Sequence, residues 1–96
     1  MHFEWDDAKD RVNVAKHGID FATAQRIFDG PVLTWPDTRR DYGEVRHVSV
    51  GRVGPGVIVV AHTRRGHRQR LISARPASRK ERRSYHERIQ EGAGTG

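Results

Sequence analysis

Two side chains that can carry a proton stand near several arginines in the middle of the chain. Glu44 is two residues before Arg46, and His62 is three residues before Arg65. Cleavage of RNA without a metal ion needs a base for the 2′-hydroxyl proton, an acid for the leaving oxygen and cations for the phosphate. These residue types can fill all three roles, so they indicate phosphodiester chemistry. The arginines expected to hold a phosphate are Arg46, Arg65, Arg70 and Arg75.

Each of these residues also has a purely structural explanation. His62 falls on an inner strand of the expected sheet and would there be a satisfied core or rim histidine. Glu44 would form an ion pair with Arg46 along the same strand face. His47 and His67 have the setting of surface residues, and no two histidines have the i, i+4 spacing of a zinc pair. We therefore expect no metal ion and no cofactor.

The positive charge is concentrated in the last third of the chain. The 18 Lys and Arg against 12 Asp and Glu leave a net charge of +6. Residues 1–60 hold 8 basic and 9 acidic side chains, whereas residues 61–96 hold 10 basic and 3 acidic. Most of these cations are arginine, whose planar guanidinium matches pairs of phosphate oxygens. An anionic partner is the leading expectation, although a GC-rich genome would also raise the arginine content with no ligand involved.

Length and composition exclude several classes of protein. A chain of 96 residues with 34% hydrophobic positions can build one domain around one modest core. Because cysteine is absent, disulfides, thiolate nucleophiles and Cys-based zinc sites are excluded. The longest apolar run, residues 57–61, is too short to span a membrane, and the N-terminus has no signal-peptide pattern. We expect a soluble, cytoplasmic protein with no membrane partner.

The first third of the chain predicts one short strand followed by two short helices. Phe3 and Trp5 alternate with polar neighbours, as they would in a strand. Asp6 is a good N-cap for a helix that runs to about residue 17 and ends at Gly18. Asp20 caps a second helix, which a Gly-Pro pair stops at residues 30 and 31.

From residue 32 onward the apolar residues recur with a period of two, which predicts four strands in an antiparallel meander that follows chain order. The strands are expected over residues 32–35, 45–53, 57–63 and 68–74. Strict alternation on the last strand puts Arg68, Arg70, Ile72 and Ala74 on one face and Leu71, Ser73 and Arg75 on the other.

The end of the chain predicts a third helix. Ser78 and Glu81 fit the S-x-x-E capping box, and the helix should run to about Gln90. The fold class is therefore α+β, with a single domain over residues 1–91 and a flexible tail over residues 92–96.

Several blocks of the sequence match a known pattern. Phe3, Trp5, Asp6 and Lys9 fit F-x-W-D-x-x-K, and Asn13, Lys16, His17, Gly18 and Phe21 fit N-x-x-K-H-G-x-x-F. A third block is Arg70-Leu71-Ile72-Ser73-Ala74-Arg75. With these blocks the chain resembles the BrnT family of type II toxins over residues 3 to about 88.

The resemblance implies a RelE-like fold and a ribonuclease activity that stops translation. It also implies neutralisation by a cognate BrnA-like antitoxin, whose ribbon-helix-helix part binds promoter DNA, so that the toxin meets DNA only through the antitoxin. Carried over by position, the catalytic residues are Glu44, Arg46, His62, Arg65 and Arg75. Six further arginines of the basic third are candidates for RNA binding: Arg64, Arg68, Arg70, Arg79, Arg82 and Arg83.

Three hypotheses for the function remain open at the level of sequence. The first is a metal-independent endoribonuclease held inactive by its antitoxin. The second is a non-catalytic module that binds nucleic acid or protein through the same arginine-rich surface. The third is a copy that has lost its activity, because Val45 and His47 depart from the residues common at these positions in the family. Arg64 is a further departure, which leaves open which residue is the general base.

Overall fold

The computed structural model describes residues 1–94 as one sheet with helices at both ends of the chain. The strands are β1 (His2–Glu4), β2 (Leu33–Asp37), β3 (Arg46–Val53), β4 (Gly56–Arg65) and β5 (Arg68–Pro76). The helices are α1 (Asp7–His17), α2 (Phe21–Ala24), the 3-10 helix η1 (Gln25–Asp29) and α3 (Arg79–Gly94). The predicted α+β class is confirmed.

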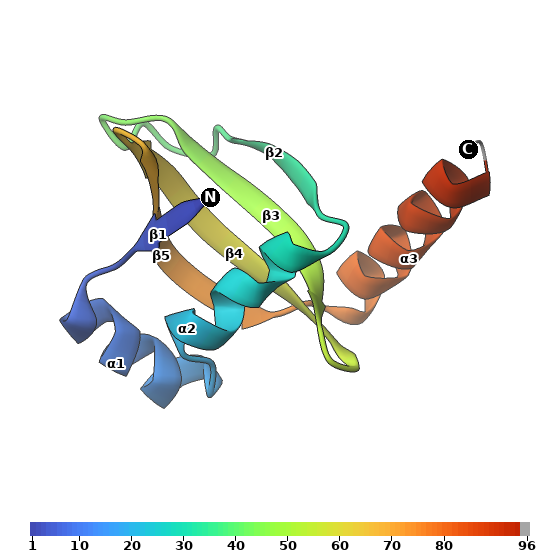
Figure 1. Ribbon diagram of the computed structural model, residues 1–96, viewed down its shortest axis with the longest axis horizontal. Coiled ribbons are helices and arrows are strands. Elements are labelled where there is room, and N and C mark those ends of the chain that lie inside the picture. The colour runs from blue at the N-terminus through green and yellow to red at the C-terminus, as the bar shows by residue number, and fades with distance from the viewer. Residues whose placement is uncertain (95–96) are drawn as a thin grey trace.

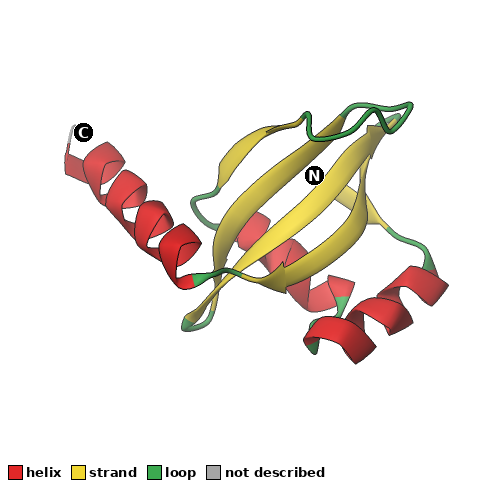
Figure 2. Ribbon diagram, turned by 180° about the vertical axis from the view of Figure 1, so that it is seen from behind, coloured by secondary structure: helices red, strands yellow, loops and turns green. Residues whose placement is uncertain are grey.

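The sheet has the strand order β1-β5-β4-β3-β2. β2 to β5 pair antiparallel in chain order. β1 pairs parallel with β5 and forms the edge of the sheet opposite β2. Figures 1 and 2 show that α1, α2 and η1 all lie against one face of the sheet, whereas α3 stands to one side, next to β2. We call the two sides the covered face and the open face.

The N-terminal helices begin and end at capping residues. The Asp6 side chain accepts a hydrogen bond from the Lys9 amide at 3.0 Å, and Gly18 ends α1 with a φ of 71°. The Asp20 side chain caps α2 in the same way at Thr23. Asp10 of α1 also accepts from the Phe21 amide, so the two helices hold each other at a fixed angle.

The prediction of strict alternation along β5 is wrong, because the strand contains a β-bulge. His62 lies opposite Leu71 and the preceding residue, Ala61, lies opposite Ser73, which leaves Ile72 without a partner on β4. Because of this extra residue, the side chains after Ile72 lie on the opposite face from the one that strict alternation predicts. Leu71 and Ala74 therefore both enter the core, and Arg75 lies on the same face as Arg70.

Asn13 on α1 holds the strand at this bulge. Its amide group accepts from the Ala74 N–H at 3.0 Å and donates to the Ala74 carbonyl at 2.9 Å and the Ile19 carbonyl at 2.8 Å. β1 pairs only with residues 68–70 of β5, so Asn13 takes the place of a neighbouring strand beyond that point. A buried asparagine thus fixes where the open-face residues of β5 point.

The core lies between the helices and the covered face. Phe21, Ala24 and Ile27 pack there on β4 and β5; with Ile58, Val60, Leu71 and Ala74 they form one buried cluster. Gly51 faces Ile27 so closely that a β-carbon at residue 51 would lie 2.7 Å from the Ile27 Cβ. The absence of a side chain at Gly51 lets η1 settle on the sheet.

α3 packs on the sheet through only a small part of its surface. The S-x-x-E capping box forms, with the Glu81 amide and the Ser78 hydroxyl 3.1 Å apart. Tyr85 is buried against Val50, Val57 and Val59, and its hydroxyl donates to the Pro31 carbonyl at 2.7 Å. Of the predicted tail, residues up to Gly94 belong to α3, and residues 95 and 96 lie outside the described part of the chain. Within residues 1–94, no helix has the length and apolar character needed to cross a bilayer.

Candidate functional site on the open face

The strand register lines up a row of polar side chains across all five strands. Asp37 lies opposite Arg46, Arg46 opposite Thr63, Thr63 opposite Arg70, and Arg70 opposite Glu4. Residues directly opposite each other share a face, so this row belongs to the open face. The next row runs through Trp35, Val48, Ala61 and Ser73, and the third through Leu33, Val50, Val59 and Arg75.

Glu44 joins two of the predicted catalytic arginines. Its carboxylate oxygens lie 3.2 Å from the Arg46 Nε and 3.2 Å from an Arg65 Nη. Partial desolvation raises the pKa of Glu44, but the hydrogen bonds and charges of the two arginines outweigh it and leave the pKa below its ordinary value. The structure therefore brings Glu44, Arg46 and Arg65 together, with the carboxylate ionised.

A second cluster continues from Arg46 along the loop between β2 and β3. The Arg46 guanidinium lies over the Tyr42 ring, 4.0 Å from its centroid, in cation–π geometry. The Tyr42 hydroxyl donates to Asp37, which also accepts two hydrogen bonds from the Arg39 guanidinium at 2.9 and 3.0 Å. The Arg39 hydrogen bond is the main reason why the pKa of Asp37 falls to about 2. Tyr42 thus links this ion pair to the cluster around Glu44.

Arg75 forms the third charged group of the open face. Two of its guanidinium nitrogens contact the two Glu81 oxygens at 2.7 and 2.9 Å, a bidentate pair. This hydrogen bonding lowers the pKa of Glu81 to about 2, while the same contact raises the pKa of Arg75. The positive charge of Arg39 lies near enough to work against that rise. Two guanidinium groups therefore stand close together, each tied to one carboxylate.

Arg39 and Arg75 line a hollow of about 320 Å³, which we call the arginine hollow. Val48, Val59 and Ala61, from β3 and β4, form its apolar floor. Figure 2 shows this side of the sheet, with α1 and α2 behind the strands and α3 at one side. The remaining lining residues are Trp35, Pro36, Asp37, Thr38, Ser73 and Glu81. Its size and lining suit a ribose or base on the floor with a phosphate at the two arginines.

His62 lies on the other face of the sheet, and the structure does not bring it to these arginines. It is buried between the Phe28 ring, 5.3 Å away, and the His47 ring, 6.0 Å away. Burial is the main cause that lowers the pKa of His62, so the ring is neutral near pH 7. Its Nδ1 lies 2.9 Å from the Gln69 amide oxygen, and its Nε2 lies 2.7 Å from the Ser49 hydroxyl.

These contacts fix the state of the His62 ring. An amide oxygen only accepts, so Nδ1 carries the proton and Nε2 accepts from the Ser49 hydroxyl. Ser49 in turn lies 2.7 Å from the Thr34 hydroxyl, which completes the chain of hydrogen bonds. His62 is thus a fully satisfied interior histidine, the structural alternative that the sequence had left open.

The predicted RNA-binding arginines are spread over three parts of the molecule. Arg70 lies on the open face and is paired with Glu4 at 2.6 Å, and Arg68 lies opposite Arg65 at the same end of the sheet. Arg64, which alternates with Arg65, faces the other way and donates to the Gly66 carbonyl. Arg79, Arg82 and Arg83 are exposed on α3. Only part of the predicted set therefore joins the open face.

The prediction from sequence missed Arg39, Tyr42 and Trp35 among the residues of the site. All three lie in or beside the loop between β2 and β3, in the first two-thirds of the chain where the net charge is close to zero. The Trp35 side chain is 43% exposed, which is unusual for a tryptophan in a strand of a small domain. The signal available in the sequence was an aromatic residue directly before an arginine-containing loop; only the structure shows that it is exposed.

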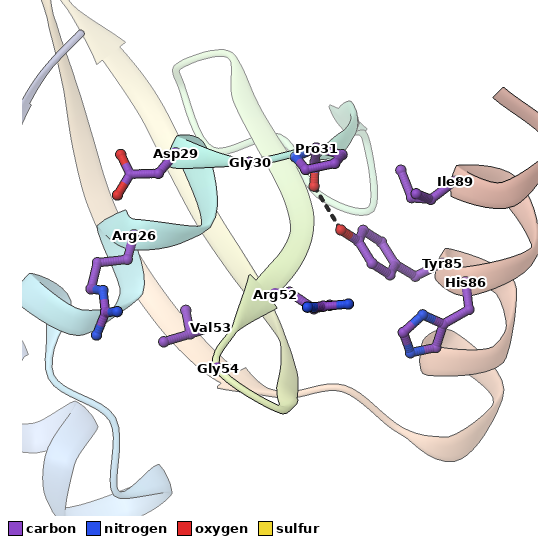
Figure 3. Close-up of a pocket in the computed structure, with 10 residues that line it drawn as sticks. All are labelled: Arg26, Asp29, Gly30, Pro31, Arg52, Val53, Gly54, Tyr85, His86 and Ile89. Atoms are coloured by element: carbon purple, nitrogen blue, oxygen red, sulfur yellow. Dashed lines mark hydrogen bonds between the residues drawn. The ribbon is translucent and has the colours of Figure 1, made fainter. Parts of the chain in front are cut away.

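A second hollow, with a volume of about 480 Å³, lies between η1, the end of β3 and α3, and Tyr85 is among its lining residues. Figure 3 shows Arg52 and His86 lying near each other on the side of α3, while Asp29 extends away from them. The Tyr85 hydroxyl reaches the Pro31 carbonyl between the two sides. Because Asp29, Arg52 and His86 are exposed and none of them belongs to the open-face clusters, we assign them no role in catalysis.

No group of three or more His, Asp or Glu side chains is placed to hold a metal ion within residues 1–94. Comparison with protein families finds a match to the model described as the ribonuclease toxin, BrnT, of type II toxin-antitoxin systems. The match covers residues 5–81, well over half of the chain. A comparison with curated proteins finds no match.

Proposed function

The chain belongs to the BrnT family of ribonuclease toxins of type II toxin-antitoxin systems, and on that basis we propose that it is a metal-independent endoribonuclease acting on its open face. The observation that carries this proposal is the grouping of Arg39, Arg46, Arg65 and Arg75 on the open face, beside α3, each paired with a carboxylate. RNA phosphates would displace those carboxylates from the guanidinium groups.

Glu44 is the proposed general base. In the free protein its pKa lies below the ordinary value, so the carboxylate is ionised but held by Arg46 and Arg65. A phosphate that takes over the two guanidinium groups removes the main reason for the low pKa. The freed carboxylate is then a stronger base at the moment when substrate is bound.

The reaction that follows is transfer of the phosphoryl group to the neighbouring 2′-oxygen. Glu44 takes the 2′-hydroxyl proton, the 2′-oxygen forms a bond to phosphorus, and the bond from phosphorus to the 5′-oxygen breaks. The 5′-oxygen takes a proton from water, which leaves a cyclic phosphate and a 5′-hydroxyl. Arg46 and Arg65 stabilise the extra negative charge of the transition state, a role that usually contributes the most to catalysis of this kind.

Tyr42 and Asp37 act as positioning residues for this chemistry. The Tyr42 ring packs against the Arg46 guanidinium, and the Tyr42 hydroxyl donates a hydrogen bond to Asp37. Arg75 and Arg39, at the arginine hollow, are proposed to hold the adjoining phosphate. Guanidinium contacts to phosphates carry no base identity, so little sequence selectivity is expected from these residues.

A non-catalytic RNA-binding module is the second candidate. The pKa values of Asp37 and Glu81, both about 2, favour it, because carboxylates held so acidic are weak bases. Glu44 is the exception on this face, since no such strongly depressed value applies to it. The two candidates therefore differ at Glu44.

The deciding experiment replaces Glu44 with glutamine. Wild type, Glu44→Gln and the matched control Asp29→Asn are incubated with purified total RNA in the presence of EDTA and, separately, with a translating extract that contains no EDTA. RNA affinity is measured on its own. We expect Glu44→Gln to lower the cleavage rate by about 10²–10⁴-fold, the range of a general base, with RNA affinity retained. Asp29 is exposed on η1, so Asp29→Asn should cleave like wild type. Intact RNA with wild type in both assays contradicts the nuclease and favours the binding module.

Further parts of the proposal follow from family membership. The fold is proposed to be RelE-like, and the natural inhibitor to be a BrnA-like antitoxin with a ribbon-helix-helix part that binds the promoter DNA. The protein would then act on RNA in the cytoplasm and stop translation. Its contact with DNA would be indirect, through the antitoxin.

A further inference from the structure

An apolar groove runs between β2 and α3, next to the arginine hollow. It has a volume of about 520 Å³, and Leu33, Trp35, Val50 and Tyr85 form its apolar lining. Figures 1 and 2 both show α3 on the side of the sheet where β2 forms the edge. Thr34, Lys80, Glu81, Ser84 and Arg88 complete the groove, which we call the β2–α3 groove.

Both walls of this groove are incompletely packed. α3 is described over 16 residues, yet among those with described side chains only Tyr85 is buried, and Glu81 and Ile89 are half-buried. On the opposite wall Trp35 is 43% exposed. A helix attached through so few side chains and an exposed tryptophan across from it are typical of a surface that another chain completes.

The charges at the rim of the groove indicate which kind of molecule can bind there. Within residues 1–94 neither Lys80 nor Arg88 forms an ion pair, and the one carboxylate of the groove, Glu81, is already held by Arg75. A second copy of this chain would bring further arginines of its own α3 to this rim. An RNA strand would satisfy the cations but would leave polar phosphates against Leu33 and Val50. An acidic polypeptide with large apolar side chains satisfies both features.

The groove also adjoins the proposed active surface. Trp35 and Glu81 line both the β2–α3 groove and the arginine hollow. A chain in the groove therefore covers one wall of the hollow, and a carboxylate on that chain can compete with RNA for Arg75. Occupation of the groove would inhibit cleavage without any residue having to reach Glu44.

We propose that the β2–α3 groove is the docking site of the antitoxin, which binds there with an acidic segment that places a large apolar side chain between Trp35 and Tyr85. This inference rests on the proposed function, because membership of a toxin-antitoxin family is what requires a protein partner. Aromatic residues that line a pocket, with cations at the rim, are the usual centre of such an interface.

The test compares two double variants on the same helix. Lys80→Glu with Arg88→Glu reverses the two groove cations, and Arg82→Glu with Arg83→Glu makes the same change in charge at exposed positions that do not line the groove. Affinity for the full-length cognate antitoxin is measured by titration calorimetry. We expect the groove variant to bind at least about 100-fold more weakly than wild type, which corresponds to roughly 2.7 kcal/mol, and the control to bind within about fivefold.

Trp35→Ala provides a second variant that does not depend on charge. It should weaken antitoxin binding by about 10–100-fold, since truncation of a central aromatic residue usually has an effect of this size. Antitoxin binding to the groove variants at wild-type strength, an equal loss in the Arg82/Arg83 control, or a self-association that the groove variant abolishes would each overturn the inference.

RNA cleavage is followed on the same samples, with and without antitoxin. Wild type that binds antitoxin through the groove but cleaves no RNA contradicts the proposed nuclease and leaves the docking site supported. If wild type cleaves RNA and the groove variants bind the antitoxin as tightly as wild type does, the nuclease is supported and the docking site is overturned. The two proposals can therefore fail separately.

Discussion

The two faces of the sheet use polar residues in opposite ways. On the open face, Arg46, Arg65 and Arg75 are charged, partly exposed and paired with carboxylates that a phosphate could replace. On the covered face, His62 is neutral, buried and satisfied by Ser49 and Gln69. Both sets come from the same strands and alternate along them.

The difference shows that a residue type does not define a role until its face is known. An ion pair near solvent is worth little in stability and can be exchanged for a substrate at small cost. A buried histidine with both nitrogens occupied has no free position for a substrate proton. The open face is therefore suited to chemistry and the covered face to holding the fold.

After Glu44→Gln, the largest effect should come from an arginine of the open face. Arg65→Ala should lower the rate of RNA cleavage by about 10²–10³-fold, the usual loss when one charge-stabilising donor is removed. Circular dichroism should show an unchanged fold. Arg26→Ala removes an exposed guanidinium from η1, on the covered side, and is the matched control. Equal losses in both variants would mean that overall charge, not the open face, determines the rate.

A large effect on stability should come from Asn13. Asn13→Ala removes three hydrogen bonds and leaves the Ala74 N–H and carbonyl without partners, which should lower the free energy of unfolding by about 3 kcal/mol in urea titrations. Arg11→Ala, at an exposed position of the same helix, should change it by less than about 0.5 kcal/mol. If the two variants unfold alike, Asn13 does not hold the bulge.

The pH dependence of stability should separate the faces. The pKa of His62 is lowered by burial, so the unfolded chain binds its proton more readily, and stability falls as the pH drops through the ordinary value of 6.5. The slope should reach at most about 1.4 kcal/mol per pH unit. His62→Gln should flatten this region of the curve, and His67→Gln, at an exposed turn, should leave it as in wild type.

The open-face carboxylates should respond at lower pH. The pKa of Glu81 is about 2 because of Arg75, so its contribution is present above the ordinary value of 4.5 and is lost as the pH falls towards 2. Glu81→Gln should remove that acid-side loss and leave the response above pH 5 unchanged. A curve that is altered near pH 6 by Glu81→Gln would contradict the assignment of these two regions.

The smallest effect is expected on the exposed side of α3. Arg82→Ala with Arg83→Ala should weaken RNA binding by no more than about threefold at physiological salt, because these side chains project into solvent away from the arginine hollow. The slope of log affinity against log salt should change by less than about 0.7, which is the value for one phosphate contact on a single strand. A larger change in slope would add α3 to the RNA-binding surface.

Local signals in the sequence predicted the elements of this fold well. Asp6, Gly18 and Asp20 mark the ends of α1 and the start of α2, and Ser78 with Glu81 marks the start of α3. These signals act over three or four residues through backbone hydrogen bonds, so no distant contact is needed to read them. The family resemblance came from the same local blocks, and the family match confirms it.

The site was predicted in part. Arg46 and Arg65 lie on the same face of neighbouring strands, which alternation along β3 and β4 already favoured, and Glu44 reaches both from the bend before β3. Arg39 and Tyr42 could not be placed, because their roles depend on how a loop folds over the edge of the sheet. His62 could not be assigned either, since its partners Ser49 and Gln69 come from two different strands.

The sequence by itself determined the α+β class, the helix ends and the concentration of arginines in the last third, because these depend on composition and on contacts over a few residues. Only the tertiary structure decided which face each β5 residue occupies. The bulge at Ile72 arises where Asn13, 61 residues before Ala74, holds the strand beyond the end of β1. Such a long-range contact leaves no periodic trace in the sequence. It nevertheless places Arg75 on the open face, whereas Leu71 and His62 are buried on the covered face.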